Sequence, residues 1–469
     1  MSDKPLWQLS ASEQAEAIAS KKVTSVEVVG ASIERMKATN AALNAVVDDL
    51  SESALAQAKE HDAIMAASGP IGPLHGVPVT IKVNVDQEGR ASTNGVVALK
   101  DMIAPGDAPI VTNFTKAGAI VIGRTNTPEF SFRATTSNEL HGRTFSPWND
   151  WATSGGSSGG ASSAVMAGMG SLAHGNDIGG SLRYPAAATG AATVKPGLGR
   201  TPAWNPSQQA ERGLLAQLMS VQGVIAREVR DVRLAMKSLI AYDAQDVWQV
   251  AMPFDGPKPE GKIKVAFTKN TFDFDLDPAI SVALDHARDC LVDAGYEVVE
   301  VEPPLINEIA EVGGKCLFGE AKALMLDDIR KYGSATINKI FDSYFEYFEP
   351  YEGKDLLLGM AKRSYYIRQW QLFMQDYPLV LTPFLPMQTP VWNLDEIEGA
   401  KEALGTGIYS FSMNYMGLPA GNIPAAYNDD LPIAVQIVAP RFREDMILDA
   451  CEAIEQRTGV MAERLFERG

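Results

Sequence analysis

Two serines framed by glycines are the residues of this chain best suited to covalent chemistry. Ser157 lies in the run Gly-Gly-Ser-Ser-Gly-Gly at residues 155–160, and Ser181 follows two further glycines. Glycine adopts positive φ readily and lets backbone N–H groups approach a ligand closely. Such N–H groups can stabilise the negative charge that develops on a carbonyl oxygen during acyl transfer. Residues 153–185 are therefore interpreted as a catalytic centre.

A serine hydroxyl needs a base before it becomes a good nucleophile, and Lys82 is a candidate for that base. Lysine has an unperturbed pKa of about 10.4, so Lys82 could serve only if burial keeps it neutral. On this interpretation Ser157 relays a proton from Ser181 to Lys82. Backbone N–H groups of the following residues would form an oxyanion hole, each worth about 3 kcal/mol at the transition state: Ile178, Gly179, Gly180 and Ser181.

Each of these features also has a simpler interpretation. Lys82 could face solvent from an edge strand, because it falls on the face opposite its apolar neighbours. The G-x-S-x-G pattern around Ser157 resembles a nucleophile elbow, but the residues before it are turn-like and an elbow needs a strand there. The G-x-G-x-x-A pattern at residues 168–173 ends a helix-like run, which disfavours dinucleotide binding. A flexible Gly/Ser linker is disfavoured because its flanks are apolar.

A Ser-His-Asp triad is a rival hypothesis. No local motif brings a histidine to either serine, although His174 lies close to Ser181 in sequence. No histidine pair has the spacing of a metal site either. The chain contains five histidines: His61, His75, His141, His174 and His286.

Helix and strand signals alternate along the chain, which predicts an α/β architecture. Two sequences with capping-box spacing, Ser10–Glu13 and Thr24–Glu27, are expected to begin helices. A helix over residues 108–117 separates two predicted strands. The first, at residues 78–83, alternates at period two, and the second, at residues 119–123, has the continuous apolar character of a buried parallel strand.

Composition disfavours several classes of function. The net charge of −17 argues against nucleic acid and anionic membranes as partners, because both attract a basic surface. No apolar run is long enough to span a membrane, and the N-terminus lacks the pattern of a signal peptide. Three widely spaced cysteines form neither a zinc motif nor a disulfide framework, so we expect a cytoplasmic protein.

In combination these motifs resemble the amidase signature family. The likeness rests on Gly76–Lys82, on the Gly-Gly-Ser-Ser-Gly-Gly run and on Asp177–Pro185. It extends to Gly123–Phe130, Ser146–Asn149, Gly417–Ala420 and Leu431–Gln436, and so covers nearly the whole chain.

The resemblance implies a Ser–cis-Ser–Lys triad of Ser181, Ser157 and Lys82, with Asp177, Arg183 and Ser158 supporting the active-site loop. It implies one α/β/α domain over residues 1–469, with a mostly parallel mixed sheet between helical layers. It implies neither cofactor nor metal. Residues 1–67 would supply N-terminal helices. Residues 242–375 match the family least and would form a variable, mostly helical region on the substrate side.

The family resemblance predicts hydrolysis of carboxamide C–N bonds in a small-molecule substrate, through an acyl-enzyme. An aromatic cluster at residues 341–351 either packs in the core or forms a wall or lid for an apolar or aryl group. A carbamate or ester substrate would need the same chemistry. Other hypotheses are the ammonia-releasing subunit of a tRNA-dependent amidotransferase and a non-catalytic binding scaffold. A homodimer is expected from the family alone.

Four positions depart from the usual family pattern. Val83 stands where aspartate is common, and Asn176 where threonine or serine usually precedes Asp177. His174 replaces a small residue, and Ser154 replaces a frequent proline. None of these changes removes a predicted triad residue, so they indicate a distinct subgroup.

Overall fold

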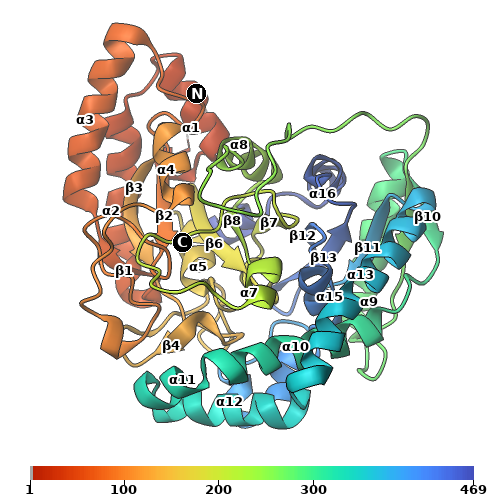
Figure 1. The fold of residues 1–469 in the computed structure, drawn as a ribbon. Helices are drawn as coiled ribbons and strands as arrows, with labels where there is room; N and C mark the ends of the chain where they lie inside the picture. Colours follow the sequence, from red (N-terminus) through yellow and green to blue (C-terminus); the bar gives the residue numbers. More distant parts are fainter. Residues whose placement is uncertain (1–3, 469) are drawn as a thin grey trace.

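A sheet of eleven strands runs through the protein in a computed structural model that describes residues 4–468 (Figure 1). Across the sheet the strands follow the order β1-β3-β2-β6-β8-β7-β12-β13-β11-β9-β10. The strands are β1 Val46–Asp49, β2 Pro78–Lys82, β3 Ile120–Thr125, β6 Leu172–Asp177, β7 Ala192–Lys195, β8 Val221–Ala226, β9 Lys264–Phe267, β10 Glu297–Glu300, β11 Leu379–Pro383, β12 Ala420–Asn428 and β13 Leu431–Val438. A separate pair consists of β4 Ser137–Asn138 and β5 Gly142–Arg143.

The sheet is mixed, which confirms the predicted α/β class. In the described chain four neighbouring pairs are parallel, namely β3–β2, β2–β6, β11–β9 and β9–β10. The other six pairs are antiparallel, so the expectation of a mostly parallel sheet is wrong. The error has a local cause. Clear strand–helix–strand patterns occur at residues 78–123 and 262–302, where the paired strands are parallel, whereas the central strands β6, β7, β8 and β12 carry weaker signals.

Helices cover both faces of this sheet. They are α1 Ala11–Ala19, α2 Ser25–Leu43, α3 Ser51–Ser68, α4 Pro109–Lys116, α5 Gly159–Met166, α6 Arg183–Thr189, α7 Leu214–Met219, α8 Val229–Leu239, α9 Pro278–Asp293, α10 Ile306–Leu324, α11 Leu326–Tyr332, α12 Ala335–Phe348, α13 Gly353–Asp376, α14 Leu394–Ile397, α15 Ile408–Met416, α16 Glu444–Thr458 and α17 Met461–Phe466. One face packs on α4, α8, α9 and α16. The other packs on α2, α3, α5 and α6, and towards β9 and β11 on α10, α12, α13 and α15.

Both predicted capping boxes form. Ser10 begins α1 and Thr24 begins α2, each accepting from the backbone N–H of the glutamate three residues later. The N-terminal 67 residues are not only helical, however. Strand β1 lies between α2 and α3 and pairs antiparallel with β3, which the sequence did not reveal.

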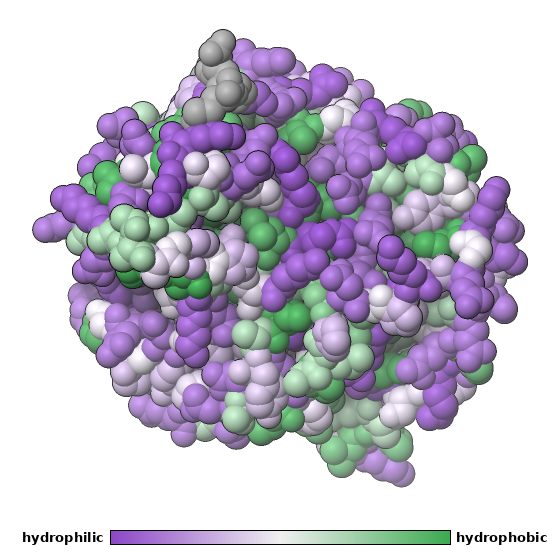
Figure 2. Space-filling view, turned by 90° about the horizontal axis from the view of Figure 1, so that it is seen from above, coloured by the Kyte–Doolittle hydropathy of each residue, from purple (hydrophilic) through white to green (hydrophobic). Residues whose placement is uncertain are grey.

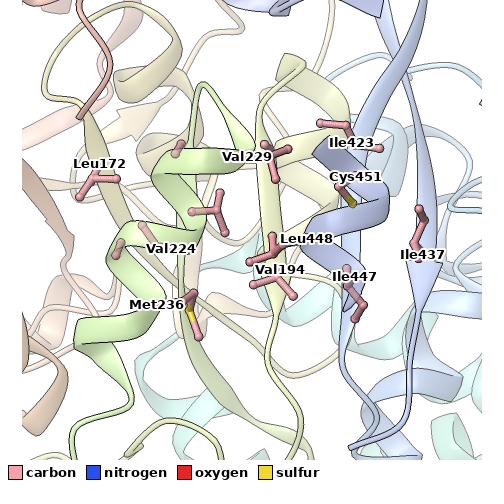
Figure 3. Packing of buried hydrophobic residues seen from close by; sticks show 14 of the residues in the cluster. Leu172, Val194, Val224, Val229, Met236, Ile423, Ile437, Ile447, Leu448 and Cys451 are labelled. Carbon is pink, nitrogen blue, oxygen red and sulfur yellow. The ribbon is translucent and has the colours of Figure 1, made fainter. Parts of the chain in front are cut away.

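Successive side chains along a strand point to opposite faces of the sheet, so they pack into different hydrophobic cores. In β8, for example, Val224 belongs to the core under α8 and α16, whereas Ile225 faces the core of α5 and α6. Figure 3 shows the first of these cores, where Met236 of α8 and Leu448 of α16 lie over the sheet. Full burial of one such side chain stabilises the fold by about 1.5–3 kcal/mol.

Hydrophilic residues cover much of the face shown in Figure 2, with hydrophobic residues gathered in smaller patches. Among the described residues, no helix combines the length and apolar character that crossing a bilayer requires. Residues 242–375 contain α9 to α13 together with β9 and β10. Their role on the substrate side stays a prediction. That the whole chain forms a single domain also stays a prediction.

Candidate active site

Lys82 lies on an interior strand. β2 pairs in parallel with β3 on one side and with β6 on the other, and the Lys82 side chain has no exposed surface. The alternative of a solvent-facing lysine on an edge strand is therefore wrong. Its neighbours Val79 and Ile81 point into the core under α4 and α8, so Lys82 points to the opposite face of the sheet.

The Lys82 amine contacts three polar side chains. Nζ lies 2.7 Å from Ser157 Oγ, 3.0 Å from Ser158 Oγ and 2.9 Å from Asn176 Oδ1. Burial lowers the pKa of Lys82 well below its usual value, and the negative charge of Asp177 opposes this only in part. The site therefore favours a neutral amine with a lone pair.

Two of these contacts set the direction of the amine. Asn176 Oδ1 can only accept a hydrogen bond, and its orientation is held by Asn176 Nδ2, which donates to Asn84 Oδ1 at 3.0 Å. Ser158 Oγ donates to the main-chain oxygen of Asn176 at 3.4 Å, so it accepts from Nζ. A neutral amine has two N–H bonds, and these two acceptors take both. The lone pair is left for the Ser157 hydroxyl.

Ser157 lies just before α5 and is almost fully buried. The Gly156–Ser157 peptide bond is cis. A Cβ at Gly156 would come within 2.2 Å of the Arg133 carbonyl oxygen, so only glycine fits the close approach of these two segments. No strand immediately precedes Ser157, which agrees with rejecting a nucleophile elbow.

Asp177 organises the loop that carries Ser181. It ends β6 and accepts backbone N–H bonds from Gly180 at 2.8 Å and Leu182 at 3.1 Å. Arg183 Nε donates to the same carboxylate at 3.1 Å. Burial on its own would raise the pKa of Asp177, but the Arg183 charge and its hydrogen bonds lower that pKa to about 2. A permanently ionised Asp177 thus holds the loop in one shape.

The predicted oxyanion hole needs one correction. The Gly180 N–H already donates to Asp177 Oδ1 and is not free for a substrate oxygen. Among the hydrogen bonds of residues 4–468, none is donated by the N–H of Ile178, Gly179 or Ser181. These three groups are the donors that the loop leaves available.

Two distant side chains complete the support of this loop, and sequence reasoning assigned neither of them a role. Asn414 of α15 donates to Asp177 Oδ1 at 2.9 Å and accepts from Arg183. Gln436 of β13 accepts from Arg183 Nη1 at 2.8 Å. The only sequence feature that pointed to Gln436 is its place in a segment that resembles the family. No sequence feature pointed to Asn414.

Ser181 is partly exposed and lines a pocket together with Gly156. The space inside this pocket, including the part open to solvent, is about 420 Å³. The remaining wall is mainly apolar and comes from several elements: Phe132, Ile178, Tyr184, Leu317, Phe318, Leu404 and Phe411. The pocket therefore suits an apolar or aryl group next to the serine.

The aromatic cluster at residues 341–351 packs behind this wall. Phe341 and Tyr344 are fully buried, and no residue of the cluster lines the pocket. The Phe341 ring lies 5.4 Å from Phe132, and Phe348 stacks on Phe318 at 4.5 Å between centroids. The core interpretation of the cluster is therefore favoured over a lid.

The histidine triad is not supported. No histidine in the described part of the chain hydrogen bonds to Ser157 or Ser181. His174 is buried beside β2, contacts Gln222 Oε1 at 2.9 Å, and burial lowers its pKa to about 3. His61 and His75 stack on each other. Within residues 4–468, no group of three or more His, Cys, Asp or Glu is arranged to hold a metal ion.

Known proteins resemble this chain over nearly its whole length. The sequence model of the Amidase family matches residues 27–448. The indoleacetamide hydrolase of Bradyrhizobium diazoefficiens is 49% identical over 99% of this chain and 89% of that protein. The acylamidase of Rhodococcus erythropolis is 31% identical over 96% of this chain and 95% of its own.

A crystal structure shares the fold. It is that of a bacterial aryl acylamidase of the amidase signature family, with a TM-score of 0.84 and 25% identity over 99% of both chains. The family match, the identity to a named amide hydrolase and the shared fold agree with one another. The chain belongs to the amidase family and is an amide-hydrolysing enzyme.

Proposed function

We propose that this enzyme hydrolyses aryl-substituted carboxamides with Ser181 as nucleophile, Ser157 as proton relay and Lys82 as base. The observation that carries the proposal is the contact of 2.7 Å between a fully buried Lys82 Nζ and Ser157 Oγ. A buried amine with its lone pair aimed at a serine hydroxyl can take a proton at neutral pH, which an exposed lysine cannot.

In the acylation step Ser181 Oγ attacks the carbonyl carbon of the amide. The Ser181 proton passes to Ser157 while the Ser157 proton passes to Lys82. The N–H groups of Ile178, Gly179 and Ser181 hold the oxyanion. When the C–N bond breaks, Lys82 returns its proton through Ser157 to the leaving nitrogen. Water then repeats the sequence on the Ser181 ester, releasing the carboxylate and regenerating the triad.

The substrate class is inferred from the pocket wall. Phe132, Phe318 and Phe411 surround the space beside Ser181, and aromatic side chains suit a flat apolar ring. The 49% identical relative is named for indoleacetamide, an amide of this class. We therefore infer an arylacetamide substrate. The corresponding esters and carbamates would use the same acyl transfer chemistry.

The amidotransferase alternative has less support. A glutamine substrate presents an ammonium and a carboxylate, which need charged partners in the site. The only charged side chain along the wall in the described chain is Arg133, and it is already paired with Asp395 at 2.7 Å and Glu396 at 2.6 Å. This alternative predicts glutaminase activity and co-purifying subunits.

A substrate panel tests the proposal. Indole-3-acetamide, phenylacetamide, acetamide, methyl phenylacetate and a phenyl carbamate are compared with glutamine by release of ammonia or acid. We expect the two arylacetamides to be turned over fastest and Ser181→Ala to remove that activity. Ser53→Ala, at an exposed serine on α3, is the matched control. Full arylacetamide turnover by Ser181→Ala would refute the mechanism, and a preference for glutamine would refute the substrate class.

Three further expectations stay proposals. The family pattern suggests one domain over residues 1–469 and a homodimer. A cytoplasmic location is supported by Cys290, Cys316 and Cys451, which are buried free thiols. Sedimentation velocity measures the oligomeric state directly.

A further inference from the structure

A second cavity lies near the catalytic loop and shares no lining residue with the catalytic pocket. The space inside it, including the part open to solvent, is about 970 Å³, against about 420 Å³ for the pocket of Ser181. It is lined by the connection from β7 to β8, between Leu198 and Val221, and by residues 245–248. We call it the Trp204 cavity.

Its two aromatic walls are held in place by one carboxylate. Asp246 accepts the backbone N–H of Ala203, next to Trp204, at 2.6 Å and that of Trp248 at 2.7 Å. The indole of Trp248 also donates to Gln217 Oε1 at 3.0 Å. The two tryptophan-bearing segments are thus tied together within the protein. A ligand would meet walls that are already ordered, which lowers the entropy cost of binding.

Arg212 places a cationic group in the cavity wall. Its guanidinium has five N–H donors and makes one hydrogen bond in the described chain, to the Ala203 carbonyl oxygen at 3.2 Å. Three carboxylates lie near Arg212, those of Asp246, Glu211 and Glu320, and none of them hydrogen bonds to its guanidinium in the described chain. Glu320 accepts backbone N–H bonds from α7. Asp246 accepts backbone N–H bonds, and the exposed Glu211 accepts from Gln208 Nε2 at 2.9 Å. A planar guanidinium with unused donors matches the geometry of a carboxylate.

Two exposed apolar side chains also line the Trp204 cavity. Val247 is 82% exposed and Trp248 is 38% exposed, although both are large hydrophobic residues. They lie on the long connection between α8 and β9, which Figure 1 shows as an extended loop. A cavity that combines apolar and aromatic side chains with a few polar groups is typical of a small-molecule site.

We propose that the Trp204 cavity is a second binding site, for a flat aromatic carboxylate. The ring lies against Trp204 and Trp248, and the carboxylate pairs with Arg212. This ligand class includes the acid that the proposed reaction releases. Binding itself does not depend on turnover, so the site can be tested whether or not the proposed function is correct.

The cavity is linked to the catalytic residues on two sides. Asn205, beside Trp204, donates to the main-chain oxygen of Asn84, whose side chain holds Asn176. Glu320 accepts from the first N–H groups of α7 at 2.8 Å, and its helix α10 also carries Phe318 of the catalytic wall. A bound carboxylate therefore sits next to two elements that shape the active site.

Titration calorimetry with phenylacetate tests the proposal. Wild type should show a binding event that Arg212→Gln and Trp204→Ala each weaken about tenfold or more, as expected for loss of a charge-assisted contact or a ring contact. Trp204→Phe should keep most of the affinity. Arg368→Gln and Trp151→Ala, at exposed positions, are the matched controls and should bind like wild type.

The uncharged analogue 2-phenylethanol separates the two contributions. It should bind wild type more weakly than phenylacetate and should not respond to Arg212→Gln. Thermal melts confirm that each variant folds, and if Arg212→Gln does not, the two Trp204 variants decide. The proposal is overturned if wild type does not bind phenylacetate, or if only Phe318→Ala, in the catalytic pocket, weakens binding.

Discussion

Asn176 Oδ1 lies 2.9 Å from the Lys82 amine and determines where the lone pair of that amine points. Together with Ser158 it takes both N–H bonds of the neutral amine, so the lone pair is directed at Ser157. The threonine or serine expected at position 176 is shorter and carries a hydroxyl that can also donate. The amide oxygen of Asn176, by contrast, can only accept a hydrogen bond from the Lys82 amine and cannot donate one to it.

Asn176→Asp should move the rising limb of the pH profile of kcat/KM to higher pH. A carboxylate in contact with Lys82 favours the ammonium form and raises its pKa by about one to three units. Since the reaction needs the neutral amine, activity at neutral pH falls about tenfold or more and recovers at alkaline pH. Profiles from about pH 5 to about pH 10 measure this. Asn176→Thr, which adds no charge, should leave the limb in place, and an unchanged limb in Asn176→Asp would contradict the assigned base.

Lys82→Met should lose activity by about 10²-fold or more and change how stability depends on pH. Burial lowers the folded-state pKa of Lys82 well below the unfolded value of about 10.4. Between these two pKa values the unfolded chain binds a proton that the folded chain does not. Wild-type stability therefore rises with pH across that window.

A methionine at position 82 binds no proton in either the folded or the unfolded chain. The free energy of unfolding of Lys82→Met, minus that of wild type, should fall steadily as pH rises towards about 10. Urea titrations across that range measure the difference. Lys100→Met, at an exposed position, should show no such trend. If the two variants behave alike, Lys82 is not neutral in the folded protein.

Arg183→Met should destabilise the fold strongly. Arg183 and Asp177 are both completely buried, and the substitution leaves the Asp177 charge without its partner. Breaking such a pair costs about 3–5 kcal/mol, which urea unfolding measures. Arg233→Met removes a partly exposed pair with Asp449 and should cost less than about 1 kcal/mol. Equal losses in the two variants would show that the buried pair does not hold the loop.

Phe318→Ala should reduce kcat/KM for phenylacetamide about 10- to 100-fold and leave that for acetamide nearly unchanged. The ring lines the catalytic pocket, so it contacts an aryl group but not a methyl group next to Ser181. Phe345→Ala, in the aromatic cluster but outside the pocket, is the matched control. Equal losses with both amides would place the aryl group elsewhere.

Local signals predicted much of this protein. The capping boxes at Ser10 and Thr24 formed because an N-cap hydroxyl and a glutamate three residues later interact within one turn. The glycines around Ser157 marked a place where backbones approach closely, and Gly156 indeed has no room for a Cβ. These features depend on neighbours in sequence and can be read without the fold.

Other features required partners from distant parts of the chain. Only the strand order β3-β2-β6 shows that Lys82 is buried, because the same alternating sequence would suit an edge strand. Likewise, Gly180 has the sequence position of an oxyanion donor, but the folded Asp177 carboxylate accepts its N–H. Asn414 and Gln436 reach Arg183 from α15 and β13, more than 200 residues later.

The sequence alone determined the residue types for acyl transfer: two serines among glycines and a lysine within an apolar strand. Tertiary structure decided which atoms meet, which N–H groups remain free and which charges are buried. The physical reason is that side-chain chemistry is local, whereas desolvation and hydrogen-bond geometry depend on every segment packed around a group. Lys82 can act as a base only because segments from across the chain exclude water from its amine.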